Sequence, residues 1–227
     1  HSRTRADART RGVKPLKEAV RRKFQRDNNL DYALDEVMVS NGSKQIMYDA
    51  LMASVNTGDE VVIPTPGWIS YADQATVAGA RPVFVSCPEN NQFKLRAADL
   101  AAVITPRTKW VVLNFPNNPT GAVCSRAEMR AIADVLLGHP HVMVMADDVY
   151  EHLIYDDFGF CTIAEVEPKL KERTLTVNGA SKAYAMTGWR VGFAGGPRPL
   201  IAAMTNMQGQ IGSGISTISQ AAATAAL

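Results

Sequence analysis

From residue 31 onward, short apolar segments alternate with segments of helical periodicity. The strand-like segments are 37–39, 60–63, 82–86, 109–114, 141–146, 174–177 and 191–195. One helix-like segment, 15–24, precedes this region, and the others are 45–55, 69–77, 97–104, 126–137 and 199–207. Strands that are apolar along their whole length and repeatedly precede helices predict an α/β fold, with a mostly parallel sheet covered by helices on both faces. We find no internal repeat or low-complexity linker, so we expect one sheet domain.

Composition excludes several classes of protein. Of the 227 residues, 46% are hydrophobic and 20% are charged, which is ordinary for a globular domain. The net charge of +2 gives no reason to expect nucleic acid or an anionic membrane as a partner, and no apolar run approaches the roughly 20 residues of a membrane span. The 3 cysteines are far apart and lack metal-ligand spacing. We therefore expect reduced thiols, no metal and a cytoplasmic protein.

Both ends of the chain look cut. It begins at His1, and residues 219–227 stop inside an alanine-rich helical pattern without a stop signal. Residues 1–11 are basic and contain one acid, which favours a solvated arm; an organelle transit sequence is the alternative. We divide the chain into an N-terminal arm and helix (1–30) and a sheet domain (31–227) that is incomplete at its C-terminus.

Lys182 stands in a setting that would explain reactivity. It follows Asn178 to Ser181, small and polar residues that suit a tight turn from a strand into a loop, and Arg190 comes a few residues later. A lysine that attacks a carbonyl must be partly neutral, and burial or a cationic neighbour would favour that state. The arginine would suit the phosphate of a cofactor captured as a Schiff base. The alternative is ordinary surface charge.

Other polar residues also stand where predicted strands end. Gly42-Ser43-Lys44, Asn118 and Asp147 each follow a different strand-like segment. Ligands of parallel sheets bind beyond the carboxyl ends of the strands, so we expect these residues and Lys182 to share a site.

Pyridoxal phosphate would find a candidate here for each of its groups. Asp147 would keep the ring nitrogen protonated, while Tyr150 and Asn118 would donate to the ring hydroxyl. For Asp147 the alternatives are a helix N-cap or a solvated acid, and the segment around Asn118 is a turn by composition.

The phosphate and the ring face have candidates too. Backbone N–H groups of Gly42, Ser43 and Lys44 at a helix start would bind the phosphate together with Arg190. Trp68 would stack on the ring. Helix capping by Gly42-Ser43 and a core position for Trp68 are the alternatives.

These residues lie within longer motifs that resemble a known family. The motifs are SNGSKQ (40–45), GDEVVIP (58–64), WISY (68–71), ITPRTK (104–109), NNPTGA (117–122), DDVYEH (147–152) and TVNGASKAYAMTGWR (176–190). From about Gly12 to Leu227 the chain is similar to the pyridoxal-phosphate-dependent class I/II aminotransferases of fold type I, and most similar to the bacterial aspartate/aromatic aminotransferase branch. The resemblance implies a three-layer αβα large domain without the small C-terminal domain.

The resemblance also implies roles for individual residues. Lys182 would be the Schiff-base lysine and the proton carrier, next to Ser181 at the cofactor. Asp147 would pair with the pyridinium and Tyr150 would contact the ring hydroxyl. The remaining cofactor contacts would come from Gly42, Ser43, Lys44, Trp68, Asn118 and Arg190, and Trp68 and Asn118 would also lie near the substrate.

Activity and partners follow from the same resemblance. The reaction would exchange an amino group between an amino acid and a 2-oxo acid in a homodimer. Aspartate is the leading donor, followed by aromatic amino acids, alanine and prephenate. The arginine that grips the substrate α-carboxylate belongs to the C-terminal domain, so we expect this chain to transaminate weakly or not at all.

The chain departs from the family pattern at a few positions. Asp7 and Ala8 replace a tyrosine-threonine pair whose tyrosine reaches the partner subunit's phosphate. Gly67 stands where an aromatic residue is common, and residues 212–219 replace a Ser/Thr-rich loop.

Three other functions remain open. A fold-type-I β-lyase or decarboxylase would use the same lysine and aspartate, although the match through residues 183–190 favours transamination. A non-catalytic regulator would need a DNA-binding helix-turn-helix, and residues 1–30 hold only one predicted helix. A degenerate sheet domain would not be expected to retain so many polar positions.

Overall fold

The computed structural model describes residues 12–227, which form two compact units. One unit contains the described residues up to Ser54 together with Thr176–Leu227, and the other is Val55–Leu175. The predictions for residues 1–11, including Asp7 and Ala8, lie outside the described residues.

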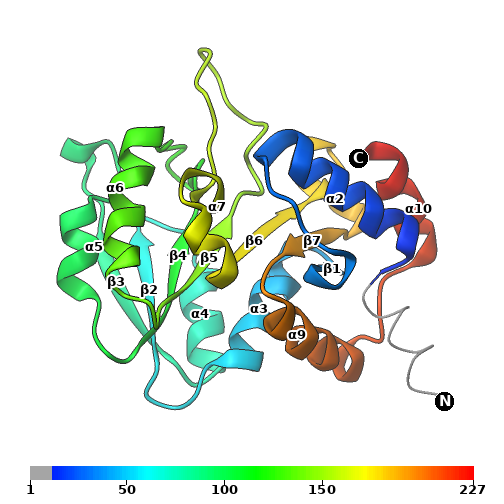
Figure 1. Ribbon diagram of the computed structural model, residues 1–227, viewed down its shortest axis with the longest axis horizontal. Helices are drawn as coiled ribbons and strands as arrows, with labels where there is room; N and C mark the ends of the chain where they lie inside the picture. Colours follow the sequence, from blue (N-terminus) through cyan, green and yellow to red (C-terminus); the bar gives the residue numbers. More distant parts are fainter. Residues whose placement is uncertain (1–11) are drawn as a thin grey trace. The chain divides into compact units, whose positions relative to one another are not determined.

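The Val55–Leu175 unit contains a parallel β-sheet. Its strands β2 (Glu60–Thr65), β3 (Arg81–Ser86), β4 (Thr108–Leu113) and β5 (Met143–Asp147) lie in the order β5-β4-β2-β3 (Figure 1). All three pairings are parallel. The connections are α4 (Ser70–Val77), η2 (Glu89–Asn91), α5 (Ala97–Val103), α6 (Arg126–Leu137), α7 (Ile163–Val166) and η3 (Pro168–Arg173).

Alternate residues of these strands bury opposite faces. Val62, Val111 and Val144 join one core cluster with the apolar sides of α5 and α6. Helix α6 begins with a capping box, in which the Ser125 and Glu128 side chains each accept from the other's backbone N–H, and this fixes where its apolar face starts. The apolar composition on both strand faces is what a helix-covered parallel sheet requires.

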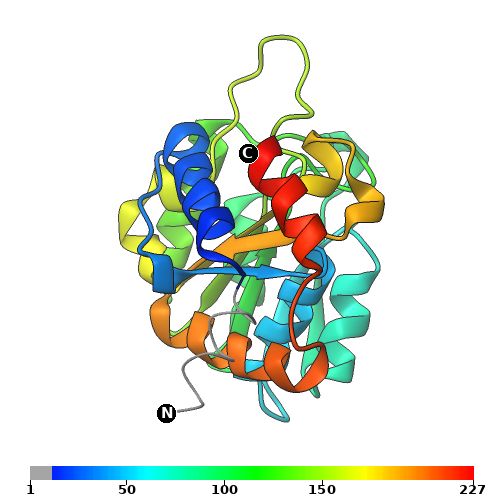
Figure 2. The same ribbon diagram turned by 90° about the vertical axis from the view of Figure 1, so that its right-hand side faces the viewer.

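The other unit has an antiparallel set of strands. Strand β7 (Gly192–Gly195) pairs on one side with β1 (Val37–Ser40) and on the other with β6 (Thr174–Gly179) through the last four residues of β6. Helices α2 (Lys14–Asn28) and α10 (Thr217–Ala226) lie on one side of these strands, and α3 (Ser43–Ser54) and α9 (Arg198–Ile211) lie on the other (Figure 2). The remaining elements are η1 (Leu34–Glu36), α8 (Ala180–Ala183) and η4 (Thr187–Trp189).

The α/β class is confirmed, and the sheet is mixed because of β7. Between β6 and β7 the chain forms only the one-turn α8 and the short η4. A parallel partner needs a crossover element that packs on the sheet, and these two turns do not provide one. The chain therefore returns antiparallel.

Some predicted boundaries were wrong. Strand β2 continues through Pro64, which was expected to end it. Pro64 has a register partner in β3, whereas the pairing with β4 stops at Val62, so the missing N–H of the proline disrupts no ladder with β4. Helix α9 runs to Ile211, four residues beyond its predicted end at Met207.

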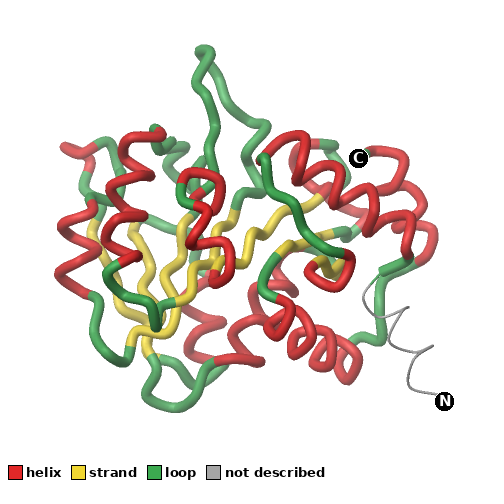
Figure 3. The backbone as a smooth tube through the Cα atoms, viewed as in Figure 1, coloured by secondary structure: helices red, strands yellow, loops and turns green. Residues whose placement is uncertain are grey.

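Residues 148–162, between β5 and α7, contain no helix or strand and extend as a long loop (Figure 3). Among residues 12–227, no helix has the length and apolar character that crossing a membrane would require.

Candidate cofactor site

Lys182 follows the end of a buried strand. Strand β6 continues to Gly179, and Ser181 and Lys182 belong to the one-turn helix α8 rather than to the predicted loop. Ser181 is buried, whereas Lys182 is exposed, so burial of the amine, one of the two reasons expected for its reactivity, is not found. The second reason, a cationic neighbour, stays a prediction.

The start of α3 forms a cradle with Arg190 in the same unit. Gly42 has φ +93°, a conformation that favours glycine, and a Cβ there would lie 2.3 Å from the Arg190 Nη2. A Cβ on Gly192 would lie 2.2 Å from the Ser43 backbone nitrogen. Glycine at both positions lets the guanidinium and strand β7 approach the helix N-terminus, where free N–H groups favour an anion.

Asn41 holds this cradle in place. Its N–H donates to Gln45 Oε1 (3.0 Å), and its carbonyl accepts from Arg190 Nη2 (3.4 Å). Arg190 also donates to the Thr187 carbonyl (3.1 Å). Sequence reasoning missed Asn41 and Gln45, although a glutamine in the first turn of a helix is a capping signal.

Asp147, in the other unit, is a buried carboxylate at the end of β5. It is 3% exposed, and its Oδ2 accepts a 2.5 Å hydrogen bond from the Tyr71 hydroxyl. Burial raises the pKa of Asp147 to about 6, while the Tyr71 bond and the Val149 N–H act in the opposite direction. Oδ1 is buried and has no hydrogen-bond partner. A protonated ring nitrogen would supply the missing donor and a compensating charge, so this residue fits pyridoxal phosphate.

Tyr71 was not predicted as a site residue. Burial and the neighbouring Asp147 carboxylate raise its pKa well above the usual value, so it remains a donor. The Trp68 and Tyr71 rings meet edge to face, with centroids 5.3 Å apart. The sequence did contain a signal for Tyr71. Trp68 and Tyr71 are three residues apart in WISY, and residues three apart in a helical turn lie on the same face, so Tyr71 could have been expected beside Trp68.

Asn118 and Tyr150 line one open pocket of about 580 Å³. Both are half-buried. The other residues that line the pocket come from the two loops after β4 and β5: Pro116, Asn117, Pro119, Gly121, Val123, Leu153, Ile154, Tyr155, Asp156 and Phe158. The two predicted ring-hydroxyl contacts thus line the same pocket, whereas Asp147 and Trp68 do not line it.

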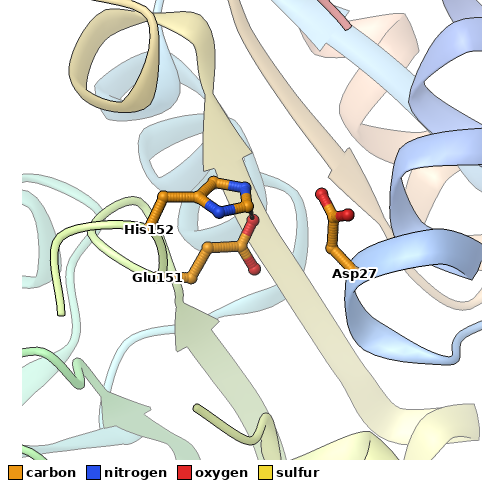
Figure 4. A group of neighbouring side chains, drawn as sticks. All are labelled: Asp27, Glu151 and His152. Atoms are coloured by element: carbon orange, nitrogen blue, oxygen red, sulfur yellow. Dashed lines mark ion pairs between the residues drawn. The ribbon is translucent and has the colours of Figure 1, made fainter. Parts of the chain in front are cut away.

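Glu151 and His152, which directly follow Tyr150, form a close pair near the start of the long loop. The His152 Nε2 lies 3.3 Å from a Glu151 carboxylate oxygen (Figure 4). Glu151 is buried and His152 is exposed. Neither side chain lines the pocket.

The predicted residues therefore fall into two groups. Gly42, Ser43, Lys44, Ser181, Lys182 and Arg190 belong to the unit with β7. Trp68, Asn118, Asp147 and Tyr150 belong to the unit with β5. Within its own unit, each group lies at or just beyond strand ends, as the sequence predicted.

Comparison with known proteins identifies the family. A family model described as aminotransferase class I and II matches residues 4–227. An aspartate aminotransferase of Rhizobium meliloti is 56% identical over 216 residues, which cover 95% of this chain and 53% of that protein. A probable aspartate/prephenate aminotransferase of Rickettsia bellii is 52% identical and covers 95% and 54%.

Solved structures agree. The crystal structure of the aspartate aminotransferase from Rhizobium meliloti matches with a TM-score of 0.95 at 55% identity, covering 96% of this chain and 55% of that one. The aromatic aminotransferase from Pyrococcus horikoshii OT3 matches with a TM-score of 0.93 at 38% identity, covering 96% and 58%. The chain spans about half the length of the curated relatives it matches. From the fold, the motifs and these matches together, the chain belongs to the class I and II aminotransferase family.

Proposed function

We propose that this chain is the cofactor-binding part of an aminotransferase that moves an amino group between an amino acid and a 2-oxo acid. The unpartnered, buried Oδ1 of Asp147 is the observation that carries the proposal. A buried acceptor without a donor is costly, and a protonated pyridine nitrogen would remove that cost. Pyridoxal phosphate is the cofactor of this family.

The cofactor supplies an aldehyde that condenses with amines and a ring that accepts electrons from the substrate α-carbon. Lys182 would form the covalent bond to the aldehyde carbon with loss of water. When a substrate amine displaces it, the freed Lys182 amine would carry the proton that leaves the α-carbon.

Other residues would hold the ring. Asp147 would keep the ring nitrogen protonated, and Asn118 and Tyr150 would donate to the ring hydroxyl. Trp68 would cover the ring face and, with Asn118, lie near the substrate. Support for these roles comes from the burial of Asp147 and from the pocket that Asn118 and Tyr150 share.

The phosphate would bind at the start of α3. Ser43 and Lys44 would donate backbone N–H groups beside Gly42, and Arg190 would add its guanidinium; Ser181 would lie next to this group. The close approach of Arg190 to Gly42 supports this assignment.

Substrates and assembly are part of the proposal. Relatives are named aspartate aminotransferase and aspartate/prephenate aminotransferase, which supports aspartate as the first donor to test, followed by aromatic amino acids. We also propose a homodimer and a cytoplasmic location, as the family resemblance implies.

A stoichiometric half-reaction tests this function without requiring full turnover. The chain is loaded with pyridoxal phosphate, mixed with a panel of amino acids, and the products are separated by chromatography. We expect the cofactor to be recovered in its amine form together with one equivalent of the 2-oxo acid. Lys182→Ala should give neither product, whereas Lys171→Ala, a lysine substitution in η3, should behave as the unaltered chain.

Two outcomes would contradict the proposal. Release of a decarboxylated amine, or of a β-elimination product with the cofactor returned as the aldehyde, would identify the related lyase or decarboxylase chemistry. Absence of any cofactor binding would remove the proposed function altogether.

A further inference from the structure

Asn114 is a buried side chain that connects two residues of the proposed ring site. It follows strand β4 directly and is 4% exposed. Its Nδ2 donates to the Asp147 backbone carbonyl over 2.8 Å, and its Oδ1 accepts from the Asn118 backbone N–H over 2.9 Å. All three residues belong to the same compact unit.

The two partners of Asn114 serve different atoms in the proposed function. Asp147 would contact the ring nitrogen, and Asn118 would contact the ring hydroxyl. These groups sit at fixed positions on a rigid aromatic ring, so their protein contacts must keep a fixed spacing. Asn114 bonds the backbone of each contact residue rather than its side chain, and it can therefore set that spacing while leaving both side chains available.

We propose that Asn114 is a positioning residue that holds Asp147 and Asn118 at the spacing of the cofactor's ring nitrogen and ring hydroxyl. This inference rests on the proposed function. The Asn114 amide would link the end of β5, which carries Asp147, to the loop after β4, which carries Asn118. Both contacts with the ring would then depend on one side chain.

A water molecule has little room to replace the hydrogen bonds of the Asn114 side chain. Asn114 and Tyr71 line the same small cavity, whose volume is about 10 Å³. Such a space is at the lower limit for one water molecule, which needs roughly 10–15 Å³. A substitution that removes either hydrogen bond therefore leaves a buried backbone group unpaired, and the loop must shift to compensate.

Two substitutions separate the two bonds. Asn114→Asp, with the new carboxyl group ionised, keeps an oxygen acceptor for the Asn118 N–H but removes the donor to the Asp147 carbonyl. Asn114→Leu removes both. Asn117→Asp is the matched control for the exchange measurement, because Asn117 lies in the same loop and its Oδ1 accepts from the Thr120 N–H and hydroxyl.

The first measurement needs no cofactor. Hydrogen exchange of the Asn118 amide is followed by NMR in the cofactor-free chain. We expect protection of this amide in Asn114→Asp and in the control, and loss of protection in Asn114→Leu. The second measurement is the dissociation constant of pyridoxal phosphate, which should rise about tenfold in Asn114→Asp and further in Asn114→Leu.

A spectroscopic readout distinguishes positioning from general loosening. The pH at which the visible band of the loaded protein changes reports the hydrogen bond to the ring hydroxyl. It should move in Asn114→Leu and stay constant in Asn114→Asp. The same shift in both variants, or unchanged affinity in both, would overturn the proposal.

Failure of the proposed function and failure of the positioning role of Asn114 give different results. If the unaltered chain binds no pyridoxal phosphate, the proposed function fails. In that case Asn114 also has no role in cofactor binding. Hydrogen exchange of the Asn118 amide still shows whether Asn114 holds the loop in place. If Asn114→Leu does not fold, Asn114→Asp alone decides through affinity.

Discussion

Asp147 has a partner on one carboxylate oxygen and none on the other. Tyr71 donates to Oδ2, and Oδ1 is buried without a donor. Desolvation is the largest influence on its pKa and raises it to about 6. At neutral pH the carboxylate is therefore mostly ionised, which is the state that a cationic ring nitrogen needs.

This chemistry predicts how cofactor affinity depends on pH. Below the pKa of about 6, Asp147 takes up a proton and loses its attraction for the ring nitrogen, so affinity should fall as the pH drops through that value. Tyr71→Phe removes a hydrogen bond to a charged group, worth about 1.5–3 kcal/mol, and the pKa of Asp147 should rise by about one or two. The midpoint of the affinity curve should move upward accordingly, as measured by titration of pyridoxal phosphate across pH 5–9.

Thr76→Val provides the control for the loss of a hydroxyl. Thr76 lies in α4, the helix that carries Tyr71; it is exposed, and its hydroxyl donates to the Ala72 carbonyl over 2.9 Å. Its substitution should leave the midpoint unchanged. An unmoved midpoint in Tyr71→Phe would show that this hydrogen bond does not set the ionisation of Asp147.

At the scale of elements, helix α3 carries the proposed phosphate cradle at its start and a buried acid farther along. Asp49 is fully buried, and neither of its carboxylate oxygens has a hydrogen-bond partner. Burial raises its pKa to about 7, an effect partly offset by the Gln45 side chain one turn earlier. Strands β1 and β7 carry no titratable residue, and Arg198 is the one charged residue of α9.

The shifted pKa makes stability depend on pH. Between pH 3.8 and about 7 the folded state holds a proton that the unfolded state has released, so stability falls as the pH rises through this window. Above pH 7 Asp49 is ionised in the folded state, and the folded state is destabilised by the full cost of burying that charge. Asp49→Asn keeps the shape and removes the charge, so it should stabilise the chain at pH 8 by up to about 4 kcal/mol. The gain should shrink towards pH 5.

Urea unfolding at pH 5 and pH 8 measures this difference. Asp31→Asn is the matched substitution in the same unit, because the Asp31 side chain is 81% exposed in its 3.5 Å ion pair with Arg21. That change should alter stability by less than about 1 kcal/mol at either pH. Destabilisation by Asp49→Asn at pH 8 would mean that the charge has a partner.

Most helices and strands followed from local patterns. Helix α6 has its predicted bounds because its capping box and apolar spacing are both local signals. The antiparallel direction of β7 was not predicted, since direction depends on what the connection packs against rather than on the strand itself. Pro64 was read as a strand end, and only the pairing on each side of β2 explains why it continues.

Across the whole molecule, the residue types of the candidate reactive groups could be proposed from the sequence, whereas the residues that support them could not. Lys182, Asp147 and Arg190 stand in motifs whose residue types suggest chemistry. Tyr71 contacts Asp147 from helix α4 and Asn114 contacts it from the loop after β4, and the sequence gives no measure of such distances. Their roles emerged only from hydrogen bonds between residues far apart in the chain.

Borohydride reduction followed by peptide mapping identifies the lysine that carries the cofactor, which we propose is Lys182. The chain is loaded with pyridoxal phosphate, reduced and digested, and the modified peptide is sequenced by mass spectrometry. We predict one phosphopyridoxyl group, on Lys182, and none in a sample reduced after treatment with a competing amine. Modification of Lys44 or another lysine in place of Lys182, or the absence of a stable adduct, would show that Lys182 does not form the Schiff base.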